Sequence, residues 1–494
     1  MKNLLYIISL CGLPTGCDLQ EEPYGFYSDD NFYKSETDAE SGLLYAYNAL
    51  TFLEYSRGIF YIGDIPTETM SPKSDEAGDV YQLENWIANR ETEQLQYYFK
   101  YCYIAINRAN TVIDHIQNSS VLSETARRRI LGEAYFLRAW NYFNLVRTFG
   151  IVPVQTKMVA ELSQTTPPMA TGLDQLYDLI LGDLTRADNL LEVNKVFGRA
   201  DKVAAQSLMA KAYLTIASSK EHNVHRYTEM RREPQIMYDS AAYWAGKVVR
   251  DYKNVYDFDT NLRDIYDVDK PTGPEHIFIM PIDRSGTQEG NYSKLPLLFL
   301  PSNNSVPFYI RYGNGDLQRA NGNGWGVFLC NDEFVETQFS TTDKRRTELI
   351  HRDIYDASGN PIVPNQVKGY FSSKYVDPDF IGERTSARPY LIRFSDIALV
   401  YAEAAGPEAG LAYVNRIRER AGVTPLPSGM TTDKFREAVI KERALELAFE
   451  GNRLYDLRRT ASVTTTDIKA AGLSEAEAAY YPIPQREIDL NPNL

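Results

Sequence analysis

The periodic spacing of apolar residues is the feature that most constrains this chain. Between residues 36 and about 219, apolar side chains recur at positions i, i+3 and i+4, which is the spacing of one face of an α-helix. In the stretch "DAESGLLYAYNALTFL" this spacing places on one face Ala39, Leu43, Ala46, Tyr47 and Leu50. The same pattern continues through residues 98–116, 124–150, 172–191, 202–218 and 238–252. It predicts a mostly α-helical protein.

Two short patterns indicate that these helices pair into repeats. Ala139 and Phe143, followed by Pro153, are spaced as in the second helix of a tetratricopeptide unit, and "MAKAY" from Met209 to Tyr213 is similar to a first helix. Such helix pairs bury their apolar faces only against neighbouring pairs. We therefore expect a tetratricopeptide-like helical repeat scaffold.

Residues 256–389 break the helical pattern. This segment is rich in Gly, Pro, Asn and Asp, with Asn-Gly turn signals and short strand-like pieces such as "HIFIMPI" and "FYIRY". Long irregular segments in otherwise regular proteins often carry function. The chain is therefore divided into helical-repeat residues 36–255, an insertion at 256–389 that contributes to a ligand site, and C-terminal residues 390–494. The last part is predicted to contain helices at 391–405, 410–422 and 434–459, followed by an extended tail.

The N-terminus has the pattern of a lipoprotein signal peptide. Lys2 precedes an apolar run at residues 4–13, which is too short to span a bilayer, and Gly16 precedes Cys17. This pattern predicts a signal peptide at residues 1–16, lipidation at Cys17 and a tether at 17–35. Pro14 departs from the usual pattern, so an ordinary secretory signal is the alternative.

Charge and ligand-residue spacing exclude several classes of protein. The net charge of −14 argues against nucleic-acid binding, which needs a basic surface to neutralise phosphates. No Cys or His spacing fits a zinc site, and no cofactor is predicted. No "DxDxDG" calcium loop is present, but the acidic composition leaves calcium binding open. Cys102 and Cys330 remain beyond the signal, and the sequence leaves open whether they form a disulfide.

Six blocks in order resemble the SusD/RagB family of outer-membrane lipoproteins of Bacteroidetes. These blocks occupy residues 132–154, 198–214, 393–405, 414–422, 442–459 and 481–494. The resemblance implies a non-enzymatic, cell-surface lipoprotein that captures a nutrient glycan and acts as a lid on a SusC-like TonB-dependent transporter. Capture of a peptide, as in RagB-like proteins, is the alternative within the family. A surface glycoside hydrolase and a helical adaptor that binds only protein are the alternatives outside it.

The carboxylates in the family blocks are interpreted as scaffold. Glu442, Glu446 and Glu450 lie one helical turn apart, so they satisfy the carboxylate spacing of a glycosidase without indicating one. We expect them to form ion pairs with nearby arginines, and we expect the same of Glu133 with Arg138 and Arg147.

The ligand site is expected in two other stretches, residues 64–86 and 291–326. Sugars present apolar C–H faces and hydroxyl groups, which suit aromatic rings and polar side chains. The candidate stacking residues are Trp86, Tyr81, Tyr292, Tyr309, Tyr312 and Trp325. The candidate hydrogen-bonding residues are Arg311, Asn314 and Asp316. Trp140 and Trp244 lie in helical patterns and are expected in the core.

Overall fold

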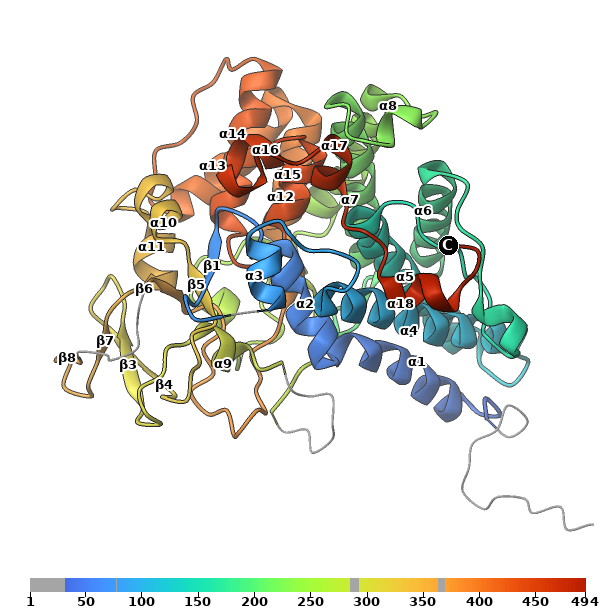
Figure 1. Ribbon diagram of the computed structural model, residues 1–494, viewed down its shortest axis with the longest axis horizontal. Coiled ribbons are helices and arrows are strands. Elements are labelled where there is room, and N and C mark those ends of the chain that lie inside the picture. Colours follow the sequence, from blue (N-terminus) through green and yellow to red (C-terminus); the bar gives the residue numbers. More distant parts are fainter. Residues whose placement is uncertain (1–31, 77, 285–292, 363–368) are drawn as a thin grey trace, which may run out of the picture.

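The structure is a computed structural model that describes residues 32–76, 78–284, 293–362 and 369–494. Within these residues the chain forms eighteen α-helices and ten short strands (Figure 1), which confirms the predicted mostly helical fold. The predicted signal peptide and Cys17 lie outside the described residues. None of the described helices is both long and apolar enough to cross a membrane.

The N-terminal region is a stack of helices in which neighbours along the chain pack on one another. α5 packs between α4 and α6, and α7 packs between α6 and α8. The helices are α1 (Glu36–Thr51), α2 (Leu53–Gly63), α3 (Asp79–Glu84), α4 (Glu93–Ile116), α5 (Glu124–Phe149), α6 (Leu173–Leu190), α7 (Lys202–Glu221) and α8 (Pro234–Asp251). Short 3₁₀ turns η1 (Leu162–Thr165) and η2 (Tyr227–Glu229) lie in the connections.

Local sequence signals fix the ends of the long helix α5. The Ser123 hydroxyl accepts a hydrogen bond from the backbone N–H of Ala126, which caps the first turn. Gly150 ends the helix at a φ of 76°, a conformation that a residue without Cβ adopts readily. The helix is buried around most of its circumference, and Trp140 lies in the core as predicted. Trp244 of α8 is partly buried and packs against the same core.

The C-terminal helices join this stack, because α12 packs against both α7 and α8. Figure 1 shows α12 and α15 beside α7, with α13 on the side toward the insertion. The C-terminal helices are α12 (Phe394–Ala405), α13 (Pro407–Arg420), α14 (Thr432–Glu446), α15 (Arg453–Arg459), α16 (Val463–Thr466), α17 (Glu475–Ala479) and α18 (Gln485–Leu490), with the 3₁₀ turn η4 (Ile468–Ala470).

Three C-terminal predictions were wrong in detail. The helix expected at 434–459 is two helices, because Phe449 and Gly451 have positive φ values of 65° and 76°. Residues 391–393 belong to a strand rather than to a helix, and residues 485–490 of the expected extended tail form α18.

The strands, all but β1 and β10 within the insertion, form small sheets rather than one large sheet. A four-stranded sheet has the order β4-β3-β7-β8, and the pairs β10-β2, β6-β9 and β1-β5 are separate. The strands are β1 (Met70–Pro72), β2 (His276–Ile279), β3 (Phe308–Arg311), β4 (Leu317–Ala320), β5 (Phe328–Cys330), β6 (Ile350–His351), β7 (Ile354–Tyr355), β8 (Pro361–Ile362), β9 (Phe371–Ser372) and β10 (Tyr390–Arg393). The short helices are η3 (Asp264–Tyr266), α9 (Leu295–Phe299), α10 (Asp332–Gln338) and α11 (Lys344–Leu349).

A buried network of ion pairs connects α13, α14 and the insertion. Arg345 Nη1 lies 2.6 Å from Glu442 Oε1, Arg420 Nη2 lies 2.7 Å from Glu446 Oε1, and Arg393 Nε lies 2.8 Å from Glu450 Oε2. Burial alone would raise the pKa of Glu450, but Arg393 and Lys374 outweigh it and hold that pKa below its usual range. The predicted scaffold role of these glutamates is therefore confirmed.

The partners expected for Glu133 were wrong. Glu133 pairs with Arg129 and Arg199, at 3.1 Å and 2.6 Å, rather than with the arginines of its own helix that follow it. Arg138 instead pairs with Asp183 of α6, where its Nε lies 2.6 Å from Oδ2. Arg147 Nη2 donates to Asn144 Oδ1 at 2.6 Å, and its guanidinium lies 3.7 Å from the ring centroid of Tyr455.

Cys102 and Cys330 are both buried and free in this structure. Burial raises the pKa of both thiols, so neither is a reactive thiolate near neutral pH. The sequence left open whether Cys102 and Cys330 form a disulfide, and in the described fold they do not.

Candidate functional site

The pairing of β1 with β5 brings the two candidate stretches together. Met70 lies opposite Cys330 and Pro72 lies opposite Phe328, and the backbone N–H of Lys73 donates to Val327 O at 3.0 Å. We call this pair of strands the ribbon. Stretches that are more than 200 residues apart in the sequence therefore share one backbone hydrogen-bond ladder, with Trp325 close to one end of it.

Trp325 presents a large aromatic surface beside this end of the ribbon. Its side chain is 45% exposed, and Lys294 Nζ lies 5.5 Å from the centroid of its ring. The same ammonium lies 2.7 Å from Glu383 Oε1. The site therefore combines an open aromatic face with a cation and a carboxylate, which is an arrangement suited to a ligand with apolar faces and hydroxyl groups.

The loop that carries Trp325 is held closely against its neighbours. The backbone N–H of Trp325 donates to Leu297 O at 2.6 Å. A Cβ added to Gly324 would lie 2.0 Å from Leu300 O, and one added to Gly322 would lie 2.0 Å from Val306 O. Because only glycine allows these backbone approaches, the loop sequence itself fixes the position of the tryptophan.

The first candidate stretch contributes one exposed ring and one buried ring. Tyr81 of α3 is 52% exposed. Trp86 is only 8% exposed, its Nε1 donates to Asp467 Oδ2 at 3.2 Å, and its ring stacks on Tyr481 at a centroid distance of 6.2 Å. The geometry of Trp86 therefore departs from the stacking role predicted for it, because its surface is already used in packing the C-terminal segment.

Five of the predicted residues lie together on the β3–β4 hairpin. Tyr309 is part of β3 and faces Arg319 of β4 and Tyr355 of β7 across the sheet. Arg311 donates to Gly359 O and lies 4.2 Å from the ring centroid of Tyr355. The Arg311 side chain is thus engaged by its neighbours, whereas Tyr309 is half-buried on β3.

The turn of the hairpin is a polar cluster rather than an aromatic platform. Asn314 Nδ2 donates to Asp316 Oδ2 at 2.6 Å, and Arg263 lies 3.3 Å from the same oxygen. These two contacts hold the pKa of Asp316 below its usual value. Tyr312 is only 6% exposed, and burial raises its pKa to about 12, so its ring is not open for stacking as predicted.

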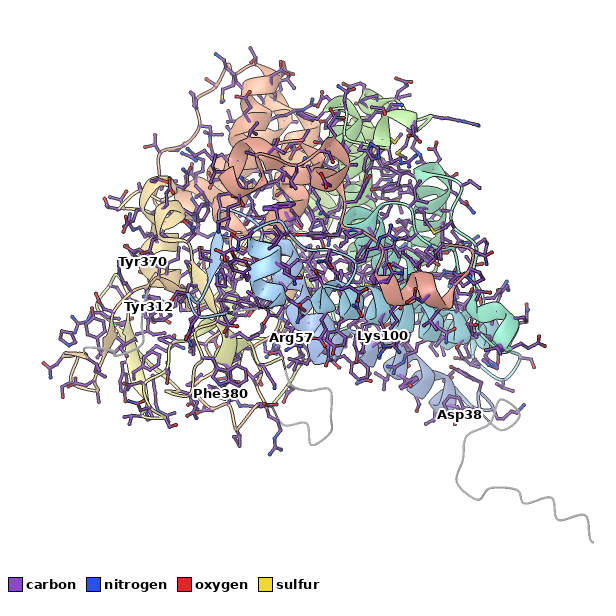
Figure 2. All side chains as sticks on the ribbon, in the orientation of Figure 1. Asp38, Arg57, Lys100, Tyr312, Tyr370 and Phe380 are labelled. Atoms are coloured by element: carbon purple, nitrogen blue, oxygen red, sulfur yellow. The ribbon has the colours of Figure 1, made fainter. Side chains whose placement is uncertain are left out.

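A polar cleft of about 580 Å³ lies between this turn and the segment around η3. Tyr312, Asp316 and Gln318 line one wall, and Asn261 and Arg263 line the other. Figure 2 places Tyr312 on the side formed by the insertion, well apart from Arg57 of α2. The predicted residues therefore do not form one site. Trp325 has its own exposed face, Tyr312 and Asp316 line the hairpin cleft, and Tyr81 and Trp86 lie on and just after α3. Tyr292 lies outside the described residues.

Sequence reasoning missed Lys294, Glu383 and Arg263. Each comes from a segment without a motif, and each reaches its position only through tertiary folding of the insertion. Among the described ranges, no cluster of three or more His, Cys, Asp or Glu side chains is arranged to hold a metal ion.

Comparison with known proteins identifies the fold and the family. Residues 34–214 match a family model described as "Starch-binding associating with outer membrane", and residues 353–494 match a model described as "SusD family". "SusD-like protein P38" of Formosa agariphila is 26% identical over 523 residues, covering 100% of this chain and 97% of the relative. A SusD-like protein of Bacteroides ovatus is 24% identical, covering 92% of this chain and 82% of the relative.

Solved structures share the same architecture. A SusD homologue from Bacteroides thetaiotaomicron superposes with a TM-score of 0.76 at 20% identity, covering 95% of this chain and 98% of the homologue. Surface glycan-binding protein A from the same organism, in complex with laminarihexaose, superposes with a TM-score of 0.72 at 20% identity, covering 92% and 97% of the two chains. The fold is thus that of a helical-repeat protein with an insertion of short strands. The chain belongs to the SusD-like family.

Proposed function

We propose that this protein binds a nutrient glycan at the face that carries Trp325. The observation that carries the proposal is the exposed Trp325 ring beside the ribbon, with Lys294 Nζ 5.5 Å from the ring centroid and Glu383 paired with Lys294. Aromatic rings stack on the apolar faces of sugars, and charged groups at the ring edge hydrogen-bond to hydroxyl groups. Tyr81 is an exposed ring on the stretch that the ribbon joins to this face, and it is our second candidate contact.

Relatives support a glycan rather than another ligand. One of the matching families is described as starch-binding, and structural neighbours include a laminarin-binding protein and a laminarihexaose complex. We further propose that the protein delivers its glycan to a SusC-like TonB-dependent transporter. This role fits the outer-membrane association named for the matching family and the lipid anchor predicted at Cys17.

We propose that binding is not followed by chemistry. The carboxylates Glu442, Glu446 and Glu450 are paired with buried arginines and a buried lysine, whereas a glycosidase acid needs a raised pKa. Around Trp325, Glu383 is paired with Lys294, and among the described residues no second carboxylate pairs with Lys294. Retaining and inverting glycosidases both need two carboxyl groups flanking the bond.

An affinity-gel screen tests the proposal. Purified protein is run through gels that contain laminarin, starch or other polysaccharides. For each polysaccharide that retards the protein, the dissociation constant is measured by calorimetry. The same mixtures are checked for released sugars. Trp325→Ala is expected to weaken binding about tenfold or more, because it removes the stacking surface. Tyr243→Ala is the matched control, since Tyr243 is a similarly exposed ring on α8, outside the proposed site.

Each outcome discriminates between the functions considered. Glycan capture is supported if the gel retards the protein without release of sugar, and if Trp325→Ala abolishes this retardation while Tyr243→Ala does not. Released oligosaccharides would establish a hydrolase. Absence of binding to every polysaccharide, with binding to a peptide library, would identify a RagB-like peptide-binding protein instead.

A further inference from the structure

A second, larger groove lies at the other end of the ribbon. It has a volume of about 730 Å³ and is bounded by β1, α10, α14 and the segment 460–469. In Figure 1, α14 and α16 lie above β1, with α10 on one side of that strand and α3 on the other. Four separate parts of the chain thus enclose the groove, and none of its lining residues belongs to the Trp325 face.

The lining is rich in hydroxyl and amide groups and also carries charged side chains, including Glu333, Glu437 and Lys441. The hydroxyl and amide groups come from three of the four walls, all except α14: Ser71, Asn331, Thr337, Gln338, Thr460, Ser462 and Thr466. Arg453 pairs with Glu68, and Lys469 pairs with Glu84. The groove therefore offers hydroxyl, amide and charged groups as hydrogen-bonding partners, which suits a ligand with many hydroxyl groups.

One of these ion pairs has unused hydrogen-bonding capacity. Arg453 Nε donates to Glu68 Oε1 at 2.7 Å. The buried atoms Glu68 Oε2 and Arg453 Nη1 have no hydrogen-bond partner among the described residues. Buried polar atoms are usually satisfied, so this ion pair in the groove wall retains one donor and one acceptor that no described residue uses.

The ribbon connects this groove to the Trp325 face. Met70 and Ser71 line the groove, while Lys73 bonds to Val327 beside Trp325. Three paired positions separate the two ends, which corresponds to about 10 Å at the rise of a strand. A chain bound at Trp325 can therefore reach the groove along the ribbon.

We infer that this groove is a second subsite for the same glycan, occupied by the continuation of a chain that is anchored at Trp325. The inference rests on the proposed function and extends it, because it makes long chains the preferred ligand. Trp325 supplies stacking at one end, and the groove supplies hydrogen bonds without an aromatic platform at the other.

The test compares chain lengths. Dissociation constants are measured for purified protein with laminarihexaose and with laminarin, and with size-fractionated oligomers of any other polysaccharide that the affinity gel retards. The groove variant is Glu437→Ala/Lys441→Ala, which removes two exposed lining side chains one turn apart on α14. The matched control is Asp433→Ala/Lys434→Ala, which removes the same two charge types from exposed positions of α14 outside the groove. Thr337→Trp is a second groove variant that fills the groove from α10.

The groove variants are expected to weaken binding of long chains about fivefold or more while leaving the shortest binding oligomer unchanged. Trp325→Ala is expected to weaken both. If long and short chains bind equally to wild type, or if neither groove variant affects long chains, the second subsite is wrong while glycan capture stands. If no glycan binds, the proposed function fails and this inference fails with it. If the groove variants lose binding to a peptide instead, the groove is a peptide site.

Discussion

At the scale of single residues, this protein places many charged side chains in its interior. Asp64 is the clearest case, because its Oδ2 accepts a hydrogen bond from the backbone N–H of Gly451 at 2.7 Å. Burial raises the pKa of Asp64 to about 7, and the nearby negative charge of Glu450 adds to that effect. The carboxyl is therefore protonated in the folded protein under mildly acidic conditions that ionise it in the unfolded chain.

This raised pKa predicts a pH-dependent stability. The unfolded chain releases the proton near pH 4, while the folded chain holds it until the pH rises past about 7. The contribution of Asp64 to stability is therefore complete below pH 4 and is lost as the pH rises to 7. Between pH 5 and pH 8, wild type should lose about 2 kcal/mol of unfolding free energy relative to Asp64→Asn, which has no proton to release. Urea unfolding of both proteins at both pH values measures the difference, and an equal difference at pH 5 and pH 8 would contradict the prediction.

The buried ion pairs predict a second residue-scale effect. Arg393 contacts both Glu275 and Glu450, at 2.5 Å and 2.8 Å, and all three side chains are almost completely buried. Removing the guanidinium leaves carboxylates without compensation, so Arg393→Ala should cost about 3–5 kcal/mol of unfolding free energy. Lys157→Ala is the control, because Lys157 is mostly exposed and pairs with Asp114 at 3.0 Å. Its cost should stay below about 1 kcal/mol by the same urea titration. A similar loss of unfolding free energy in the two variants would contradict the prediction.

At the scale of elements, periodicity predicts most helices but not where they are interrupted. The 3.6-residue pattern runs without a gap from 434 to 459, yet the chain leaves the helix after Glu446 and resumes at Arg453. The cause is tertiary, since Gly451 packs directly against α2, where Ile59 and Gly63 lie. The site shows the same limit. An exposed Trp325 and a buried Trp86 have equally ordinary local sequences, and only a partner 381 residues away, Asp467, makes Trp86 structural.

This interruption predicts an unequal cost for two glycines. Gly451 has a φ of 76°, and a Cβ there would lie 2.3 Å from Ile59 Cγ2. Gly429 has a similar φ of 78° but no heavy atom within 4 Å of its added Cβ. Gly429→Ala should therefore cost about 1 kcal/mol from backbone strain alone, whereas Gly451→Ala should cost roughly 3 kcal/mol or more because overpacking is added. Thermal unfolding of the two variants measures the difference, and equal losses would show that the α2 contact is not tight.

At the scale of the whole molecule, a segment near the N-terminal helices and a segment near the C-terminus are joined by hydrogen bonds and ion pairs. The segment 451–469 is bonded to the segment 64–86 by four contacts, Asp64 with Gly451, Glu68 with Arg453, Trp86 with Asp467 and Glu84 with Lys469. The segment 64–86 also leads into the ribbon beside Trp325. The C-terminal segment therefore holds in place the segment that leads into the ribbon, and through it the proposed glycan site.

This arrangement predicts that the regions do not fold independently. A fragment of residues 32–255 leaves the surfaces of α7 and α8 without α12, and it leaves Trp86 without Asp467 and Tyr481. We expect the fragment to lack a cooperative thermal transition, whereas the full chain should unfold in one step with coincident changes in far-ultraviolet circular dichroism and tryptophan fluorescence. Co-expression with residues 256–494 is the control, and it should restore a native-like transition because the missing contacts lie in that half. A cooperative transition of the isolated fragment would instead show that the helical repeats are a separate domain, and that the C-terminal contacts only position the site.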